Sequence, residues 1–583
     1  MAGDIYVSSV KGNDNGSGTA DAPLKTLENA LKMAREWRRL NKPEANGGIN
    51  IMMREGTYRL GKPLFVRPED SGTAASPTII RGVEGEKVTI SGGIEVKNWQ
   101  KGCSDNRIPE NLRGKIWVAD APMTGNRMVE IRQLWVNGGK ARRATQFVEG
   151  KMQRMKAFNT DDESITIPTP AIDLTNANRL EMLVMQRWAI AILRVREMKN
   201  IGNGMTKVTF HQPESQLEFA HPWPQPVIDG EYGSSGFTLM NALELIDEPG
   251  EWYQDYPSGK IYYYPKDVVD MNSADVTAPV LETLVQIEGT RERQVSHIKF
   301  DNIGFEHSAW LRPSYEGHVT LQGGFRMIDA YKLKEPGLPH KAALENQAWI
   351  ARPEAALTAR FANNIMFDDC RFTHIGATAL DFVYAVNSSE INGCSFTDIG
   401  GTAIMAGGFG EGGFETHIPY TPTIETDICS DIKISRCRID DATNEDWGCA
   451  AISAGYVKNT DIVQNEVSNV NYSGICVGWG WTANESGMRN NRIVGNNVHD
   501  YAKQLYDAGG IYTLSNQPGS VISGNTVTLP TKAPYATNER AFCVYFDEAT
   551  DGYTVEGNTF EKESYGYNQP GKSLIIGKNK YLK

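Results

Sequence analysis

Apolar positions recur in a six-residue pattern through the second half of the chain. Each copy has an apolar residue, two free positions, a residue that we call the ladder residue, one free position and a second apolar residue, as at 493–498. Short runs of alternating polar and apolar residues, broken by Gly and Asn, surround the copies, which is typical of strands. The ladder residues are Cys370, Cys394, Cys437, Asn465, Asn496, Asn525 and Asn558. Their spacing of 24 to 43 residues predicts stacked units, each one coil of a right-handed parallel β-helix.

The identity of the ladder residues has a physical reason. An Asn in a turn can bond to the Asn of the next coil and to turn amides that no sheet hydrogen bond reaches. Cys in the same position is a small buried hydrophobe. None of the eight cysteines has the spacing of a metal site, so we expect free buried thiols in the ladder and no metal.

The rest of the chain is expected to extend the same architecture. Residues 1–100 predict the first coils and an amphipathic helix from 27 to about 40, with Thr26 as N-cap, covering the open end. Residues 101–285 lack the ladder and are rich in Trp and Tyr, which favours an inserted antiparallel β-domain. Residues 286–583 then form the main β-helix. The predicted fold class is all-β.

Composition narrows the range of partners. The chain has 583 residues, a net charge of −12 and a pI of about 5.4, so no basic field exists to attract nucleic acid. No apolar run reaches transmembrane length, and we expect no membrane insertion. No secretory leader is visible before the first strand. We expect a mature form with a starting Met added, whose sequence does not itself reveal the compartment, and we expect a periplasmic or extracellular location.

Three stretches leave the repeat and are expected to wall a groove. They are residues 306–360, 407–426 and 478–485, and the last two carry His417, Trp479 and Trp481. Long excursions from compact proteins are often functional. We expect these three side chains to line a cavity with acidic residues of the last coils.

The acidic candidates lie on the last two full coils. Asp507 precedes a Gly- and Tyr-rich strand that contains Tyr512, and Asp547 and Glu548 follow a strand that contains Tyr545. Two carboxyl groups beside aromatic rings and glycines suit sugar chemistry, because the rings stack on sugar faces and the carboxyls supply acid and base. Side chains alternate along a strand, so only one of Asp547 and Glu548 can face the groove.

The ladder alignment places Ile511 opposite Val544 on the neighbouring coil. Asp507 and Asp547 are then too far apart along a straight strand, so the chain has to turn near Asp507, or one carboxyl has another partner. Glu548 is slightly favoured over Asp547 on reach. Further binding and reserve candidates are Asp500, Asp381, Glu411, Glu415 and Asp446.

Longer motifs resemble glycoside hydrolase family 141, a family of pectate-lyase-like β-helices. They are residues 4–8, 132–143, 244–253, 478–481, 506–519 and 545–548. The resemblance implies a hydrolase acting on plant cell-wall polysaccharide, and we expect no cofactor. It implies an α-L-fucosidase on complex pectin of the rhamnogalacturonan II type, or a xylanase. A β-helix polysaccharide lyase and a non-catalytic glycan-binding protein are the alternatives, and oligomeric state is open.

Overall fold

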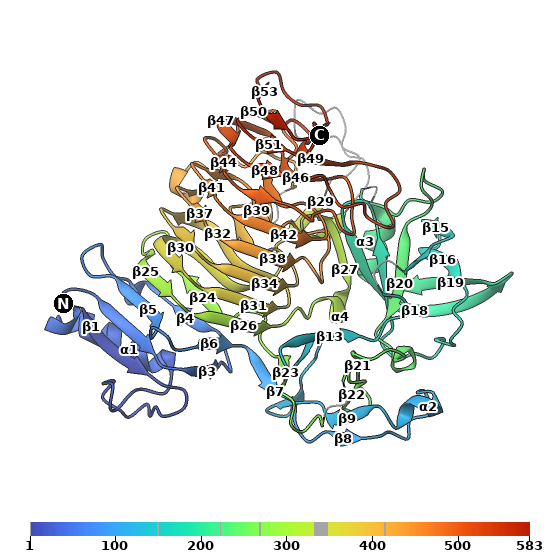
Figure 1. The fold of residues 1–583 in the computed structure, drawn as a ribbon, viewed down its shortest axis with the longest axis horizontal. Coiled ribbons are helices and arrows are strands. Elements are labelled where there is room, and N and C mark those ends of the chain that lie inside the picture. Colours follow the sequence, from blue (N-terminus) through green and yellow to red (C-terminus); the bar gives the residue numbers. More distant parts are fainter. Residues whose placement is uncertain (1, 149–150, 222, 268–269, 331–347, 413–414) are drawn as a thin grey trace.

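The computed structural model describes residues 2–583 except 149–150, 222, 268–269, 331–347 and 413–414. Parallel coils form one long stack, coloured from blue at the N-terminal end to red at the C-terminal end, and an insertion stands beside it (Figure 1). Among the described residues, no helix is long and apolar enough to cross a membrane. The predicted parallel β-helix is confirmed.

Each coil contributes strands to three walls. The first wall, which carries the candidate carboxyls, contains β4 (Leu64–Val66), β24 (Val285–Glu288), β30 (Ala355–Asp368), β32 (Thr378–Asn387), β35 (Ile404–Ala406), β39 (Ile452–Ala454), β43 (Ile475–Val477), β46 (Ala508–Thr513), β49 (Ala541–Phe546) and β52 (Tyr565–Tyr567). The second contains β1 (Gly3–Val7), β2 (Ile49–Met53), β5 (Thr78–Gly82), β25 (Val295–Asp301), the end of β30, β33 (Glu390–Asn392), β37 (Lys433–Ser435), β41 (Asp461–Val463), β44 (Arg492–Val494), β47 (Asn516–Ser523), β50 (Asp551–Glu556) and β53 (Ile575–Ile576).

The third wall contains β3 (Gly56–Arg59), β6 (Val88–Ser91), β26 (Gly304–Ser308), β31 (Arg371–Ile375), β34 (Ser395–Ile399), β38 (Arg438–Ala442), β42 (Glu466–Val470), β45 (Asn497–Val498), β48 (Thr526–Val527), β51 (Thr559–Phe560) and β54 (Lys580–Tyr581). The inward side chains of all three walls form one continuous apolar core. Phe305 and Phe372 stack at 4.9 Å, and Phe372 and Phe396 at 4.7 Å, which holds successive coils in register.

The ladder is present and reaches one coil beyond the prediction. The backbone N–H and side-chain amide of Asn465 both donate to Asn496 Oδ1, at 2.9 and 3.0 Å. Asn496 bonds to Asn525 in the same way, Asn525 to Asn558, and Asn558 to Asn579. The position before each ladder residue has positive φ, which explains the recurring Gly-Asn pair, since Gly adopts this conformation without strain.

The cysteine part of the ladder is also as predicted. Cys370, Cys394 and Cys437 are buried and free, and each thiol lies against a backbone carbonyl, at 3.4 to 3.7 Å in Cys437. At the N-terminal end, α1 (Leu27–Arg39) packs Leu27 and Leu31 onto the first coils. Thr26 Oγ1 accepts the Asn29 N–H at 3.3 Å, so the predicted cap is confirmed.

The insertion contains two largely antiparallel sheets. One includes β7 (Gly93–Glu95), β8 (Gln100–Lys101), β9 (Trp117–Asp120), β12 (Leu134–Val136), β13 (Gly139–Arg143), β21 (Glu251–Asp255), β22 (Lys260–Tyr263) and β23 (Val276–Pro279). The other includes β14 (Gln153–Arg154), β15 (Ala157–Asn159), β16 (Ser164–Pro168), β17 (Glu181–Met185), β18 (Ile190–Gly202), β19 (Met205–Phe210) and β20 (Gly236–Met240). The division at residues 100 and 285 stays a prediction, because strand pairing alone does not define domains.

The excursion at 306–360 extends this second sheet. It supplies β27 (His318–Gln322), β28 (Phe325–Ala330) and β29 (Ala348–Ala351), and β27 pairs antiparallel with β18 through Val319 and Ala191. The hairpin formed by β27 and β28 packs against outward-facing residues of the first wall. Together they form a second apolar cluster, which lies outside the coils. The first wall therefore has a cover at the place where its outer face carries the candidate site.

Candidate active site

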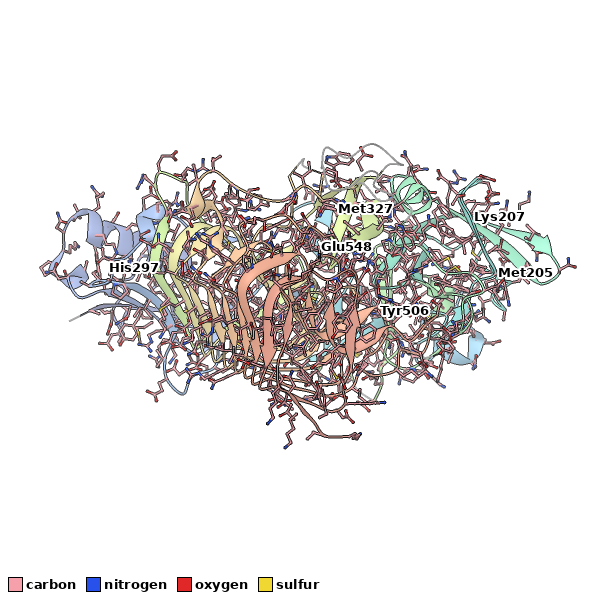
Figure 2. The ribbon with its side chains drawn as sticks, turned by 90° about the horizontal axis from the view of Figure 1, so that it is seen from above. Met205, Lys207, His297, Met327, Tyr506 and Glu548 are labelled. Atoms are coloured by element: carbon pink, nitrogen blue, oxygen red, sulfur yellow. The ribbon has the colours of Figure 1, made fainter. Side chains whose placement is uncertain are left out.

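Two adjacent strands position the candidate carboxyls. β46 and β49 pair in parallel with Ile511 opposite Val544, as the ladder alignment predicts, and Tyr512 opposite Tyr545. Ile511 and Val544 belong to the coil core, whereas the two tyrosines belong to the cluster outside it. Asp507 directly precedes β46 and Asp547 directly follows β49. Figure 2 labels their sequence neighbours Tyr506 and Glu548, which lie toward the insertion.

Asp507 is held by an arginine and a tyrosine. Arg540 Nε donates to Asp507 Oδ1 at 2.7 Å, and the Tyr545 hydroxyl donates to the same oxygen at 3.1 Å. The Tyr472 hydroxyl donates to the backbone carbonyl of Asp507 at 2.9 Å. The Asp507 side chain keeps 19% of its surface exposed, so a ligand can reach it. Its φ of +58° turns the chain at this point, immediately before β46.

Asp547 is more deeply buried than Asp507. Tyr512 donates its hydroxyl to Asp547 Oδ2, and Asn568 Nδ2 donates to Oδ1 at 2.8 Å. Burial, followed by the negative charge of Asp507, raises the pKa of Asp547 to about 6, while the bonds from Tyr512 and Asn568 act in the opposite direction. The structure thus places two electrostatically coupled carboxyls in unlike surroundings, one paired with a cation and one desolvated.

The two tyrosines have matched roles. Gln322 Nε2, from β27, donates to the Tyr512 hydroxyl at 2.9 Å, so the Tyr512 proton is directed to Asp547. Arg540 Nη2 donates to the Tyr545 hydroxyl, so the Tyr545 proton is directed to Asp507. The rings meet edge to face at 5.1 Å. Each carboxyl therefore accepts a hydroxyl whose orientation another donor fixes.

Gly509 serves this packing. A Cβ at this position would lie 3.0 Å from Tyr545 Cβ and 2.5 Å from the carbonyl oxygen of Ile511. The structure assigns Gly509 to the close packing of Tyr545 beside Asp507.

Other expected site residues lie elsewhere or are more buried than expected. Trp479 is 3% exposed, donates Nε1 to Thr416 Oγ1 at 2.9 Å and packs on Trp481, which is 9% exposed. His417 is 1% exposed and pairs with Glu415. These residues fill the cover between the wall and the β27–β28 hairpin, so they do not present the open ring faces that the sequence suggested for sugar stacking.

Asp500 does not join the carboxyl pair. It follows β45 in the third wall, is 61% exposed in its side chain and bonds to His499 at 2.7 Å.

Glu548 follows Asp547 and is half-buried, and its backbone carbonyl accepts the Ser515 N–H at 3.2 Å. Because Asp547 is the residue that bonds to Tyr512, the structure favours Asp547 over Glu548 as the partner of Asp507, against the slight preference from reach.

The reserve carboxyls form ion pairs of their own. Asp381 accepts two bonds of 2.6 Å from Arg352, which also bonds to Glu411 at 2.8 Å. Asp446 pairs with His318 at 2.8 Å. Among the described residues, no group of three or more His, Cys, Asp or Glu side chains is placed to hold a metal ion.

Sequence reasoning missed Arg540, Gln322 and Asn568. Arg540 lies in an irregular segment before β49, Asn568 lies after the short strand β52, and Gln322 comes from the distant hairpin. The signal for Gln322 was the non-repeating stretch at 306–360. No local pattern marked the other two residues.

Paired carboxyls on one covered wall of a β-helix suit the cleavage of glycosidic bonds. The profile of the GH141 insertion domain matches residues 114–266. A solved structure described as "Glycoside hydrolase" is 43% identical, covers 99% of this chain and 96% of that chain, and superposes with a TM-score of 0.94. The chain belongs to glycoside hydrolase family 141, and its expected family is confirmed.

Curated relatives match over short regions. Pectate lyase PEL9 of Emericella nidulans is 37% identical over 92 residues, or 16% of this chain. The uncharacterized protein YwoF of Bacillus subtilis is 35% identical over 91 residues. The chain spans only 19% and 16% of the lengths of these two relatives.

Proposed function

We propose that the protein is an exo-acting α-L-fucosidase that removes terminal fucose from complex pectic oligosaccharides of the rhamnogalacturonan II type. The main support for this proposal is the electrostatically coupled carboxyl pair Asp507 and Asp547 on the covered first wall. Glycosidases use two carboxyls in unlike environments, and in this pair Asp547 is desolvated whereas Asp507 is partly exposed and paired with Arg540.

The acid is assigned from the surroundings of each group. Asp547, with a pKa of about 6, holds a proton at mildly acidic pH and can give it to the glycosidic oxygen as the bond to the leaving group breaks. Its two oxygens already accept bonds from Tyr512 and Asn568, so these partners fix the plane of the carboxyl. Asp507, neutralised by Arg540, then acts as nucleophile or as the base that activates water.

The cover supports an exo mode. The hairpin β27–β28 and the Trp479–Trp481 pair cover part of the outer face of the first wall, while Asp507 and Arg540 keep 19% and 45% of their side-chain surfaces exposed. A site enclosed in this way suits a terminal sugar, whereas cleavage within a polymer needs an open cleft. The apolar residues of the cover also suit a 6-deoxy sugar, whose C6 is a methyl group. A xylan-degrading activity remains the alternative within the family.

The proposal includes the location and partners of the enzyme. Plant oligosaccharides are the expected substrate, and their presence outside the cell favours a periplasmic or extracellular site of action. The test is to incubate the purified chain separately with α-L-fucosylated pectic oligosaccharide and with xylan, and to quantify released sugars by chromatography. Free fucose supports the proposal; xylo-oligosaccharides without fucose, or unsaturated products that absorb in the ultraviolet, contradict it.

A further inference from the structure

A cavity of about 500 Å³ lies away from the carboxyl pair, between the insertion and the third wall. Strands β13, β18 and β20 contribute one side, and the ends of β31, β34 and β38 contribute the other. Figure 1 shows the insertion on one flank of the coils. The volume of the cavity is within the range of small-molecule sites, which often form at domain boundaries. Its lining shares no residue with the contacts of Asp507 or Asp547.

One carboxylate in the cavity is fully used by the protein. Asp398 accepts bonds from Trp135 Nε1 at 2.7 Å, His374 Nδ1 at 2.8 Å and Asn444 Nδ2 at 2.9 Å, and it pairs with Lys140 at 3.0 Å. These partners stabilise its charge and place its pKa well below the ordinary range despite burial. Asp398 is therefore a structural group that joins insertion and coils.

A second carboxyl, three residues before Asn444, is poorly satisfied. Asp441 has two long contacts of 3.3 Å with the same Asn444 amide nitrogen. Burial, and then the charge of Asp398, raise the pKa of Asp441. A carboxyl in such surroundings gains from any further hydrogen-bond donor that enters the cavity. Asp441 thus has acceptor capacity that the protein leaves unused.

The opposite side of the cavity has unused donors. Arg132 is 2% exposed, and its Nε has no hydrogen-bond partner among the described residues, although its other nitrogens bind Glu181. The Nε of Arg143 is likewise buried without a partner in the described ranges. A buried donor without a partner is stabilised by any acceptor, from water or from a ligand, that reaches it.

The chemistry of the lining defines the ligand. Positive charges on Lys140, Arg142 and Arg143 face negative charges on Asp441 and Glu445, so neither a strong anion nor a strong cation fits. A neutral molecule with many hydroxyls fits, because each hydroxyl both donates and accepts. Hydroxyls of Thr373 and Thr397 add partners, and the apolar part of the lining includes Phe147, Met152, Leu183, Ile192 and Trp447. Mixed apolar and hydroxyl-bonding surfaces match the two faces of a sugar ring.

We propose that this cavity is a second carbohydrate-binding site, which holds a neutral mono- or disaccharide unit apart from the catalytic pair. The site is independent of the proposed hydrolysis, since it uses none of the catalytic residues. At this site the enzyme would bind a second part of the glycan, in addition to the sugar that is cleaved.

The test is a binding measurement on the full chain. Asp547→Asn serves as the parent, so that binding is followed without turnover, and L-fucose, D-galactose and xylobiose are titrated by calorimetry and ligand-observed NMR. We expect Asp441→Ala in this background to weaken one binding event at least tenfold and to leave any binding at the catalytic pair unchanged. Asp440→Ala is the matched control, because Asp440 instead accepts bonds from Ser468 and Asn469.

The outcomes are distinct. Equal affinities in the parent and the Asp441→Ala variant, or no saturable binding of any probe to the parent, would overturn the proposal. If Asp441→Ala lowers the melting midpoint strongly, Thr397→Val replaces it and is expected to weaken the same event two- to tenfold. Affinity unchanged by Thr397→Val would overturn the proposal as well. Failure of the fucosidase assignment would leave Asp441-dependent binding intact, so the two failures are separable.

Discussion

Tyr512→Phe tests the electrostatics of the catalytic pair. Burial and the charge of Asp507 raise the pKa of Asp547, the hydrogen bond from the Tyr512 hydroxyl opposes them, and the pKa with this bond in place is about 6. A hydrogen bond to a charged group contributes about 1.5–3 kcal/mol, which corresponds to about one to two pKa units. Loss of this bond destabilises the ionised carboxyl, so Asp547 should stay protonated to higher pH. The alkaline limb of kcat/KM should therefore move from near pH 6 to about pH 7–8.

The assay is kcat/KM for a chromogenic aryl α-L-fucoside between pH 4 and 9. Gln322→Leu should give a smaller shift in the same direction, because it frees the Tyr512 hydroxyl to rotate but does not remove it. Tyr456→Phe is the matched control, since Tyr456 is buried in the same outer cluster and contacts Tyr420. An alkaline limb that stays in place or moves to lower pH in Tyr512→Phe would refute the assignment of Asp547 as the acid.

Three further substitutions and the addition of a chelator test the ladder, the cover, the role of Arg540 and the independence from metal. Asn525→Leu should leave ladder amides without partners and cost about 1–3 kcal/mol, seen as a lower melting midpoint; an unchanged midpoint would contradict the ladder's role. Trp481→Ala should loosen the packing of the cover and lower the free energy of unfolding by about 3–5 kcal/mol. A raised KM with unchanged stability would instead indicate that Trp481 stacks on a sugar. Arg540→Ala should lower kcat by at least tenfold because it leaves Asp507 without its cation, and kcat within twofold of wild type would contradict this role. A chelator should not alter turnover by a carboxyl pair, whereas loss of activity would favour a calcium-dependent lyase.

The stack of coils was predictable because a solenoid repeats its constraints. Every coil needs one residue in the turn that satisfies its neighbour's amides, and one before it with positive φ. The spacing of the Gly-Asn pairs therefore predicts the coils and also the strand register, including the pairing of Ile511 with Val544. The position of Asp507 and Asp547 at the ends of adjacent strands followed from the same alignment.

The surroundings of the site were less predictable, for physical reasons. The burial of Trp479 depends on the hairpin β27–β28, which is aligned by β18 of the insertion and not by the repeat. The long-range contact of Gln322 with Tyr512 has the same origin. Arg540 lies in a loop, where no period constrains the sequence. The choice between Asp547 and Glu548 required knowing which side chain Tyr512 meets.

The turnover of matched carboxyl variants tests most directly whether Asp507 and Asp547 form the catalytic pair. Asp507→Asn, Asp547→Asn and Glu548→Gln would each be assayed on fucosylated pectic oligosaccharide by the rate of fucose release, with melting midpoints recorded to confirm folding. The account predicts that the first two lose several orders of magnitude in kcat while Glu548→Gln stays within a few-fold of wild type. Near-normal turnover by Asp507→Asn or Asp547→Asn in a folded protein, or loss of turnover confined to Glu548→Gln, would contradict it.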